Sequence, residues 1–202
     1  QIIEQIFVLF VVVRQLVECG ERVVVLDNLS TGFREAVLDA DLVVGDVGDR
    51  SLVRSVLDDH AIGTVLHFAA HTIVPESVAN PLKYYGNNTC ATRALLATCA
   101  EAGVGEFVFS STAAVYGMPA AGEADEQTAT APINPYGMSK LMSEHMLRDL
   151  SSSSALRHVI LRYFNVAGSD PGGRIGQSTR NATLLIKVAC EHALGKRAQL
   201  SV

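Results

Sequence analysis

Residues 106–112 read Glu-Phe-Val-Phe-Ser-Ser-Thr, an apolar run that ends in three hydroxyl side chains. Short runs that are almost wholly apolar are typical of strands in a parallel sheet whose two faces are both covered by helices. A doubly wound sheet of this kind binds its ligands beyond the carboxyl ends of its strands. Thr112, which stands just after the run, is therefore a candidate site residue.

Similar runs recur along the chain and alternate with helical patterns. We expect strands at residues 23–26, 42–44, 64–68, 106–109 and 158–163, and helices at 49–59, 88–102 and 135–150. This alternation predicts an α/β fold with a doubly wound, Rossmann-type parallel sheet. After residue 168 the sequence becomes loop-like, and a last helix is expected at about 181–194. The boundaries predict a dinucleotide-binding domain over 1–165 and the start of a smaller, truncated substrate-binding domain over 166–202.

The helix expected at 135–150 carries Tyr136-Gly137-Met138-Ser139-Lys140. A Tyr and a Lys four positions apart lie on the same face of a helix. A phenol with its ordinary pKa near 10 is a poor base at neutral pH, and a nearby ammonium lowers that pKa because it stabilises the phenolate. The pair can therefore act as an acid/base device, whereas most isolated Tyr-x-x-x-Lys matches are surface packing.

Polar or small residues follow three other expected strands. Asp27 and Asn28 stand where such folds bind the ribose hydroxyls of adenosine, which favours NAD over NADP. Asp46 offers a carboxylate that can accept a hydrogen bond from the adenine amino group. Residues 67–70, His-Phe-Ala-Ala, end in small side chains that let a ligand approach the backbone. Together these positions predict a dinucleotide site.

The glycine-rich half of that signature is absent. The turn Gly-x-Gly-x-x-Gly is expected roughly 20 residues before Asp27, where residues 3–10 read Ile-Glu-Gln-Ile-Phe-Val-Leu-Phe. Glycine is needed there because the backbone turns sharply and the pyrophosphate contacts bare amides at a helix N-terminus. Bulky side chains, and repulsion of phosphate by Glu4, predict weak dinucleotide binding by this sequence. Residues 14–18 again read as a normal amphipathic helix.

Composition narrows the function classes. The chain has 202 residues, of which 49% are hydrophobic, and a net charge of -5 with both signs mixed, so it has no basic footprint for nucleic acid. The four cysteines lack Cys-x-x-Cys spacing and the histidines lack His-x-x-x-His spacing, which predicts buried free thiols and no metal site. The longest apolar run, residues 6–13, is shorter than the roughly 20 residues that span a bilayer. It also lacks the features of a secretory signal, and a cytoplasmic location without membrane contact is expected.

A series of motifs covers the chain from Val12 onward: residues 25–30, 67–70, 74–78, 84–88, 109–117, 135–140 and 161–165. In this order they resemble the UDP-glucose 4-epimerase family, a branch of the extended short-chain dehydrogenase/reductases. The resemblance implies interconversion of UDP-glucose and UDP-galactose through a transient 4-keto sugar, with a bound NAD that takes the hydride from C4 and returns it. A homodimer is compatible with it.

The resemblance also assigns roles to residues. It implies that Tyr136 is the base and acid, that Lys140 holds the nicotinamide ribose and lowers the phenol pKa, and that Thr112 bonds the reacting sugar hydroxyl. The implied NAD site comprises Asp27, Asn28, Asp46, Val47, Phe68, Ala69, Ala70, Asn88, Lys140 and Tyr163, and Asn165 would contact the nucleotide sugar. From the residues alone, ordinary core packing explains Phe68, Ala69, Ala70 and Tyr163 equally well. A role as a helix cap explains Asn88 equally well, and a role in turns explains Asp27 and Asp46.

Two alternatives stay open. The related sugar dehydratases and decarboxylases place acidic residues just after the strand-end serine or threonine, where this chain has Ala113 and Ala114, so epimerisation is favoured. A non-catalytic fragment is supported by the missing glycines and opposed by the intact Thr112, Tyr136 and Lys140. Leu184 stands where the family usually has a polar residue near the uridine diphosphate. Most of the family's carboxyl-terminal substrate domain has no counterpart, which predicts a fragment.

Overall fold

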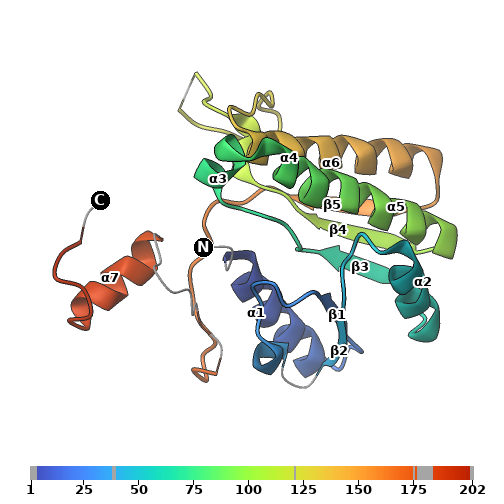
Figure 1. The fold of residues 1–202 in the computed structure, drawn as a ribbon, viewed down its shortest axis with the longest axis horizontal. Helices are drawn as coiled ribbons and strands as arrows, with labels where there is room; N and C mark the ends of the chain where they lie inside the picture. Colours follow the sequence, from blue (N-terminus) through green and yellow to red (C-terminus); the bar gives the residue numbers. More distant parts are fainter. Residues whose placement is uncertain (1–3, 38–39, 121, 175, 177–183, 201–202) are drawn as a thin grey trace.

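The computed structural model describes residues 4–37, 40–120, 122–174, 176 and 184–200, with side chains from residue 8 onward. Helices and short strands alternate along the chain (Figure 1). The strands are β1 (Val24–Asp27), β2 (Asp41–Val44), β3 (Thr64–His67), β4 (Glu106–Ser110) and β5 (Arg157–Leu161). The α-helices are α1 (Glu4–Glu18), α2 (Arg50–Asp59), α3 (Val74–Ala79), α4 (Pro81–Tyr84), α5 (Ala91–Ala102), α6 (Pro135–Ser153) and α7 (Leu185–Ala193). Short turns of other helix types are η1 (Arg34–Val37), η2 (Tyr85–Cys90) and η3 (Ala113–Tyr116).

These elements confirm the predicted α/β alternation, with differences at the boundaries. The strand expected at 158–163 ends at Leu161, and the helix expected at 88–102 is divided, because residues 85–90 form a π-helical turn that leads into α5. The last helix is α7, and residues 181–183 of its expected range lie outside the described residues. Only Cys99 of the four free cysteines is buried, so the expectation of buried thiols is wrong for the other three.

All strand pairings are parallel, but the strands form two groups. β1 pairs with β2, and β3, β4 and β5 form a second sheet in that order. Within the described part of the chain, no strand connects β1 to β3. The expected doubly wound arrangement is therefore present in two pieces, whose facing edges are β1 and β3.

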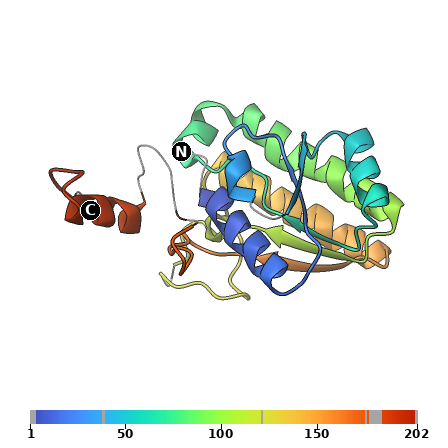
Figure 2. The ribbon, with the colours of Figure 1, turned by 90° about the horizontal axis from the view of Figure 1, so that it is seen from below.

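Helices cover only part of these sheets. α5 and α6 lie side by side on one face of β3, β4 and β5 (Figures 1 and 2). Their core contains Leu95, Phe107, Phe109 and Leu147, all less than a tenth exposed. On the opposite face of β5, Val159 is 51% exposed. The expectation that helices cover both faces is therefore wrong here, and α7 lies apart from both sheets in the two views.

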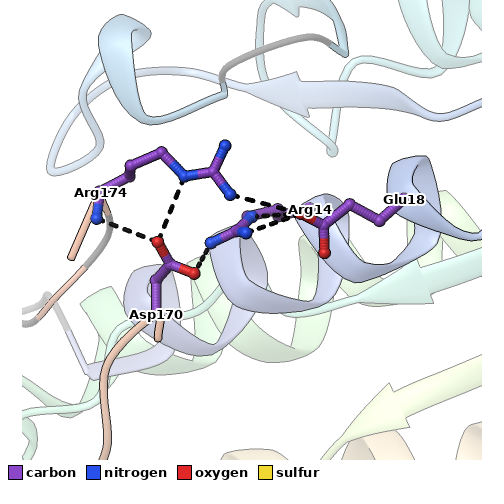
Figure 3. Close-up of polar contacts among 4 residues, drawn as sticks. All are labelled: Arg14, Glu18, Asp170 and Arg174. Carbon is purple, nitrogen blue, oxygen red and sulfur yellow. Dashed lines mark hydrogen bonds and ion pairs between the residues drawn. The ribbon is translucent and has the colours of Figure 1, made fainter. Parts of the chain in front are cut away.

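The segment after β5 returns to α1 through a cluster of four charged side chains (Figure 3). Asp170 is 5% exposed and forms an ion pair with Arg14 of α1. Its other oxygen accepts hydrogen bonds from the Arg174 backbone at 3.0 Å and from Arg174 Nε at 3.3 Å. Glu18 accepts from both arginines, at 2.6 Å from Arg14 Nη2 and 3.3 Å from Arg174 Nη2. These bonds hold the beginning of the 166–202 region against α1.

Candidate functional site

A cavity of about 510 Å³ opens between the two sheets and reaches the carboxyl ends of β1, β2 and β3. Its lining contains the short groups of polar or small residues that the sequence places at the ends of these three strands. The structure therefore brings seven predicted cofactor residues to one cavity, namely Asp27, Asn28, Asp46, Val47, Phe68, Ala69 and Ala70.

The polar residues at this end of the cavity are fixed by local hydrogen bonds. Asp27 Oδ1 accepts from the Leu29 backbone N–H at 2.7 Å, and Asp46 Oδ1 accepts from the Gly48 N–H at 2.8 Å. Asn28 Nδ2 donates to Asp46 Oδ2 at 3.1 Å and so joins the two loops. Asp27 and Asp46 thus form turns and also line the cavity, so the turn interpretation is confirmed and their role in cofactor binding stays a prediction.

The second group of predicted residues meets at the end of β4. Lys140 Nζ donates to the backbone oxygen of Ser110 at 2.9 Å, and the Ser110 hydroxyl forms a short hydrogen bond with the Tyr163 hydroxyl. Thr112 follows two residues later, and its Oγ1 accepts from the Ala114 N–H at 3.1 Å, which caps η3. A lysine of α6, a tyrosine after β5 and a threonine after β4 are thereby brought to one strand end.

The N-terminus of α6 packs closely against η3. Asn134 caps α6 by accepting from the Gly137 N–H at 2.8 Å. A Cβ on Gly137 would lie 2.7 Å from the Ala114 oxygen, so only glycine allows this approach. Tyr136, the residue before it, is 7% exposed, and its ring packs edge-on against Tyr84 with 6.4 Å between centroids. The close approach fixes Tyr136 relative to the turn that Thr112 caps.

Burial controls the charge at this site. Lys140 is 1% exposed, and burial lowers its pKa from 10.5 to about 7, although the charge of Glu144 acts in the opposite direction. His67 at the end of β3 has its pKa lowered to about 3 by burial and, to a smaller extent, by Lys140. The imidazole of His67 is therefore neutral at physiological pH, and the amine of Lys140 readily gains or loses a proton near neutral pH.

The sequence of residues 10–200 matches the model of the NAD dependent epimerase/dehydratase family. The chain belongs to this family. It is 53% identical over 192 residues to the UDP-glucose 4-epimerase of Azospirillum brasilense, covering 95% of this chain and 55% of that protein. The structure resembles the Brucella ovis UDP-glucose 4-epimerase in complex with NAD, with a TM-score of 0.88 and 42% identity over 94% of this chain and 58% of that one.

A more distant structure is that of the Bifidobacterium longum UDP-glucose 4-epimerase in complex with NAD+ and UDP. It is 33% identical, with a TM-score of 0.85, and 95% of this chain covers 60% of it. The chain thus spans little more than half the length of these relatives. None of its described helices is long and apolar enough to cross a membrane, and its described residues contain no group of side chains suited to hold a metal ion.

The cavity fits the family's dinucleotide in part. The carboxylates at the ends of β1 and β2 suit an adenosine, and the alanines after β3 leave room for a ligand close to the backbone. At the expected position of the glycine turn, however, the chain forms the first part of α1, whose Leu9, Val12 and Val13 face the cavity. No glycine precedes Gly20 in the chain. The described residues therefore supply no cradle of bare amides for a pyrophosphate.

The remaining two predicted residues differ in placement. Asn88 is 1% exposed and lies inside the π-helical turn, so it is not a helix cap. Its Nδ2 donates to the His71 oxygen at 2.9 Å and to Ser139 Oγ at 3.0 Å, which joins the cavity wall to α6. Asn165, by contrast, is exposed and does not line the cavity. Leu184 is 9% exposed and precedes α7.

A buried ion pair behind the site is absent from the sequence-based prediction. Glu144 is fully buried, and its Oε2 lies 2.6 Å from Arg162 Nη2. Its Oε1 accepts from the Ser111 side-chain Oγ at 2.5 Å, which ties α6 to the residue between Ser110 and Thr112. The signal that could have found it is its spacing, because Glu144 follows Lys140 by four residues and therefore shares its helix face.

Proposed function

We propose that this chain forms the cofactor and catalytic half of a UDP-sugar 4-epimerase that interconverts UDP-glucose and UDP-galactose. The observation that carries the proposal is that Lys140 and Tyr163 both hydrogen-bond to Ser110, two residues before Thr112. Lys140 lies on α6, the helix that also bears Tyr136. The names of the relatives support the substrate, since proteins 42–53% identical to this chain are UDP-glucose 4-epimerases. A cytoplasmic location and a homodimer are further parts of the proposal.

Each residue then has a distinct task. Tyr136 takes the proton of the sugar 4-hydroxyl and later gives it back, while Thr112 donates or accepts a hydrogen bond at the same hydroxyl. The Lys140 ammonium lowers the pKa of the Tyr136 phenol and bonds the nicotinamide ribose. NAD, when bound, supplies an acceptor and donor of hydride. The residues that would hold it are Asp27, Asn28, Asp46, Val47, Phe68, Ala69, Ala70, Asn88, Lys140 and Tyr163, and Asn165 would reach the nucleotide sugar.

The structure favours epimerisation over dehydration. Expelling water from a sugar needs an acid within reach of the leaving group, yet η3 begins with Ala113 and Ala114 directly after Thr112. The buried carboxylate nearest in sequence to Lys140 on α6 is Glu144, which is engaged by Arg162 and Ser111. It is therefore not free to protonate a substrate.

The test compares the chain with its Tyr136→Phe variant. Purified protein is incubated with UDP-galactose and NAD, and UDP-glucose is measured by chromatography. We expect slow conversion by the parent and at least a hundredfold less by the variant, because acid/base groups contribute roughly 10²- to 10⁴-fold. Equal conversion by both proteins would overturn the assignment of the base. If the parent neither converts the sugar nor carries nicotinamide absorbance, the non-catalytic alternative is correct.

A further inference from the structure

Two ionisable side chains of α6 are buried one helical turn apart. Lys140 is 1% exposed and Glu144 is 0% exposed. Residues four apart on a helix have Cβ atoms about 5–6 Å apart, so the ammonium and the carboxylate act on each other with little water between them to screen the charges. Burial favours the uncharged amine of Lys140, whereas the carboxylate of Glu144 favours the ammonium. The charge of Lys140 therefore depends on Glu144.

β3, β4 and the segment after β5 each present neutral groups at this place. His67 at the end of β3 is uncharged, because its pKa is lowered to about 3. On β4, the Ser110 backbone oxygen accepts from Lys140 Nζ at 2.9 Å, and Nζ lies 4.9 Å from the centre of the Phe109 ring. After β5, Tyr163 bonds the Ser110 hydroxyl and keeps its own proton at neutral pH, because burial raises its pKa. Glu144 is thus the group that supplies negative charge to Lys140.

Two arginines contact the same carboxylate. Arg162 donates to Glu144 from Nη2 at 2.6 Å and from Nε at 3.0 Å, and Arg148 Nη2 lies 3.7 Å away. The side chain of Arg148 is 52% exposed and that of Arg162 is 14% exposed, whereas that of Glu144 is 1% exposed. Water therefore screens the charges of the arginines more than that of the carboxylate. Glu144 still acts on Lys140 as an anion while Arg162 holds it in place.

The same carboxylate also holds the turn that carries Thr112. Glu144 Oε1 accepts from Ser111 Oγ at 2.5 Å, and the Ser111 backbone N–H donates to the Leu161 oxygen at 2.9 Å. Ser111 is therefore tied to α6 by its side chain and to β5 by its backbone. Thr112 follows directly, and its Oγ1 accepts from the Ala114 N–H at 3.1 Å. The position of Thr112 thus depends on Glu144 through Ser111.

We propose that Glu144 is a positioning residue of the acid/base site, which keeps Lys140 an ammonium and fixes the turn that carries Thr112. A charged Lys140 matters because only the ammonium stabilises the phenolate of Tyr136. The inference rests on the proposed function, which gives both effects their purpose. Both effects are nevertheless properties of the protein without NAD or sugar. They are therefore measured separately from turnover, and a parent chain that converts no UDP-galactose would refute the proposed function alone.

The first test follows the charge of Lys140 by nuclear magnetic resonance of the whole chain, labelled with carbon-13 at the lysine ε carbons. The chain has four lysines, and Lys140→Met identifies the relevant signal. We expect a titration midpoint at about pH 7 in the parent. In Glu144→Gln it should fall by roughly one pH unit or more, the effect of losing an opposite charge at this distance, whereas Glu144→Asp keeps the charge and should titrate near the parent. An unchanged midpoint in folded Glu144→Gln would overturn the proposal, because a purely structural role lowers stability without moving it.

Ser111→Ala separates the second effect, because it removes the hydroxyl and leaves the buried ion pair intact. We expect amide hydrogen exchange at Ala114 to rise roughly tenfold or more relative to Leu96, a core residue of α5, since hydrogen bonds to charged groups are among the stronger ones. The Lys140 midpoint should stay that of the parent. In Glu144→Gln the exchange ratio should be unchanged, because glutamine can still accept from Ser111. Unchanged exchange at Ala114 in Ser111→Ala would also overturn the proposal, even if Glu144→Gln does not fold.

Discussion

Replacing Glu144 by glutamine tests whether the buried ion pair behind the site holds α6 to the end of β4. Glutamine keeps the shape and can still accept from Ser111, so the change removes mainly the negative charge. Arg162, whose side chain is 14% exposed, is then left without its counter-ion. We expect the variant to fold with a lower free energy of unfolding.

The magnitude follows from burial. Removing one partner of a buried pair costs roughly 3–5 kcal/mol, because the other charge stays desolvated. The lower end is appropriate here, since glutamine retains hydrogen bonds and Arg162 keeps its contact with the Tyr116 ring at 4.9 Å. A loss of about 3 kcal/mol corresponds to a fall of roughly 6–12 °C in melting temperature for a chain of this size.

The matched control is Glu101→Gln. Glu101 also lies 2.6 Å from an arginine, Arg50, but these side chains are 57% and 51% exposed. Exposed pairs contribute about 0–1 kcal/mol. Urea unfolding of the parent and both variants, monitored by circular dichroism, gives the three free energies. If Glu144→Gln costs no more than Glu101→Gln, burial does not set the strength of this pair and the reasoning is wrong.

Three further outcomes are expected. Burial lowers the pKa of Lys140 from 10.5 in the unfolded chain to about 7 in the folded one. Between these pH values the unfolded chain binds more protons, so the free energy of unfolding rises with pH. Lys140→Met should flatten that rise in urea titrations at pH 6, 8 and 10. Gly137→Ala, whose Cβ would meet the Ala114 oxygen at 2.7 Å, should lower the unfolding free energy by about 1–3 kcal/mol in the same assay, and an unchanged value would contradict the close packing. Asp170→Asn should weaken the link to Arg14 and speed tryptic cleavage after Arg174, whereas unchanged cleavage would show that the ion pair does not hold this segment.

Much of the fold could be predicted because each strand is indicated by a local run of apolar residues. Each run of apolar residues formed a strand within two residues of its expected bounds, and the polar residues after β1 and β2 do line one cavity. Parallel strands place their carboxyl ends at one edge, so positions such as Asp27 and Asp46 converge whatever the details of the loops. That part of the site depends on strand order and direction alone.

Other features depend on contacts that a linear pattern does not contain. The pairing of Glu144 with Arg162 joins residues 18 apart on different elements. The apolar pattern predicted helices on both faces of the sheet, yet Val159 of β5 is half exposed. Apolar side chains indicate which faces of a strand need a cover, but not whether a cover is present. The two-part sheet escaped prediction for a similar reason: β1 and β3 are correctly formed strands with no described partner between them.

These observations separate two requirements of the site. The proposed acid/base residue Tyr136 and its supporting residues Lys140 and Thr112 are positioned by β4, α6 and their caps, which belong to the part of the fold built on β3, β4 and β5. A dinucleotide site also needs both halves of the sheet at a fixed separation, since its residues come from β1 and β2 as well as β3.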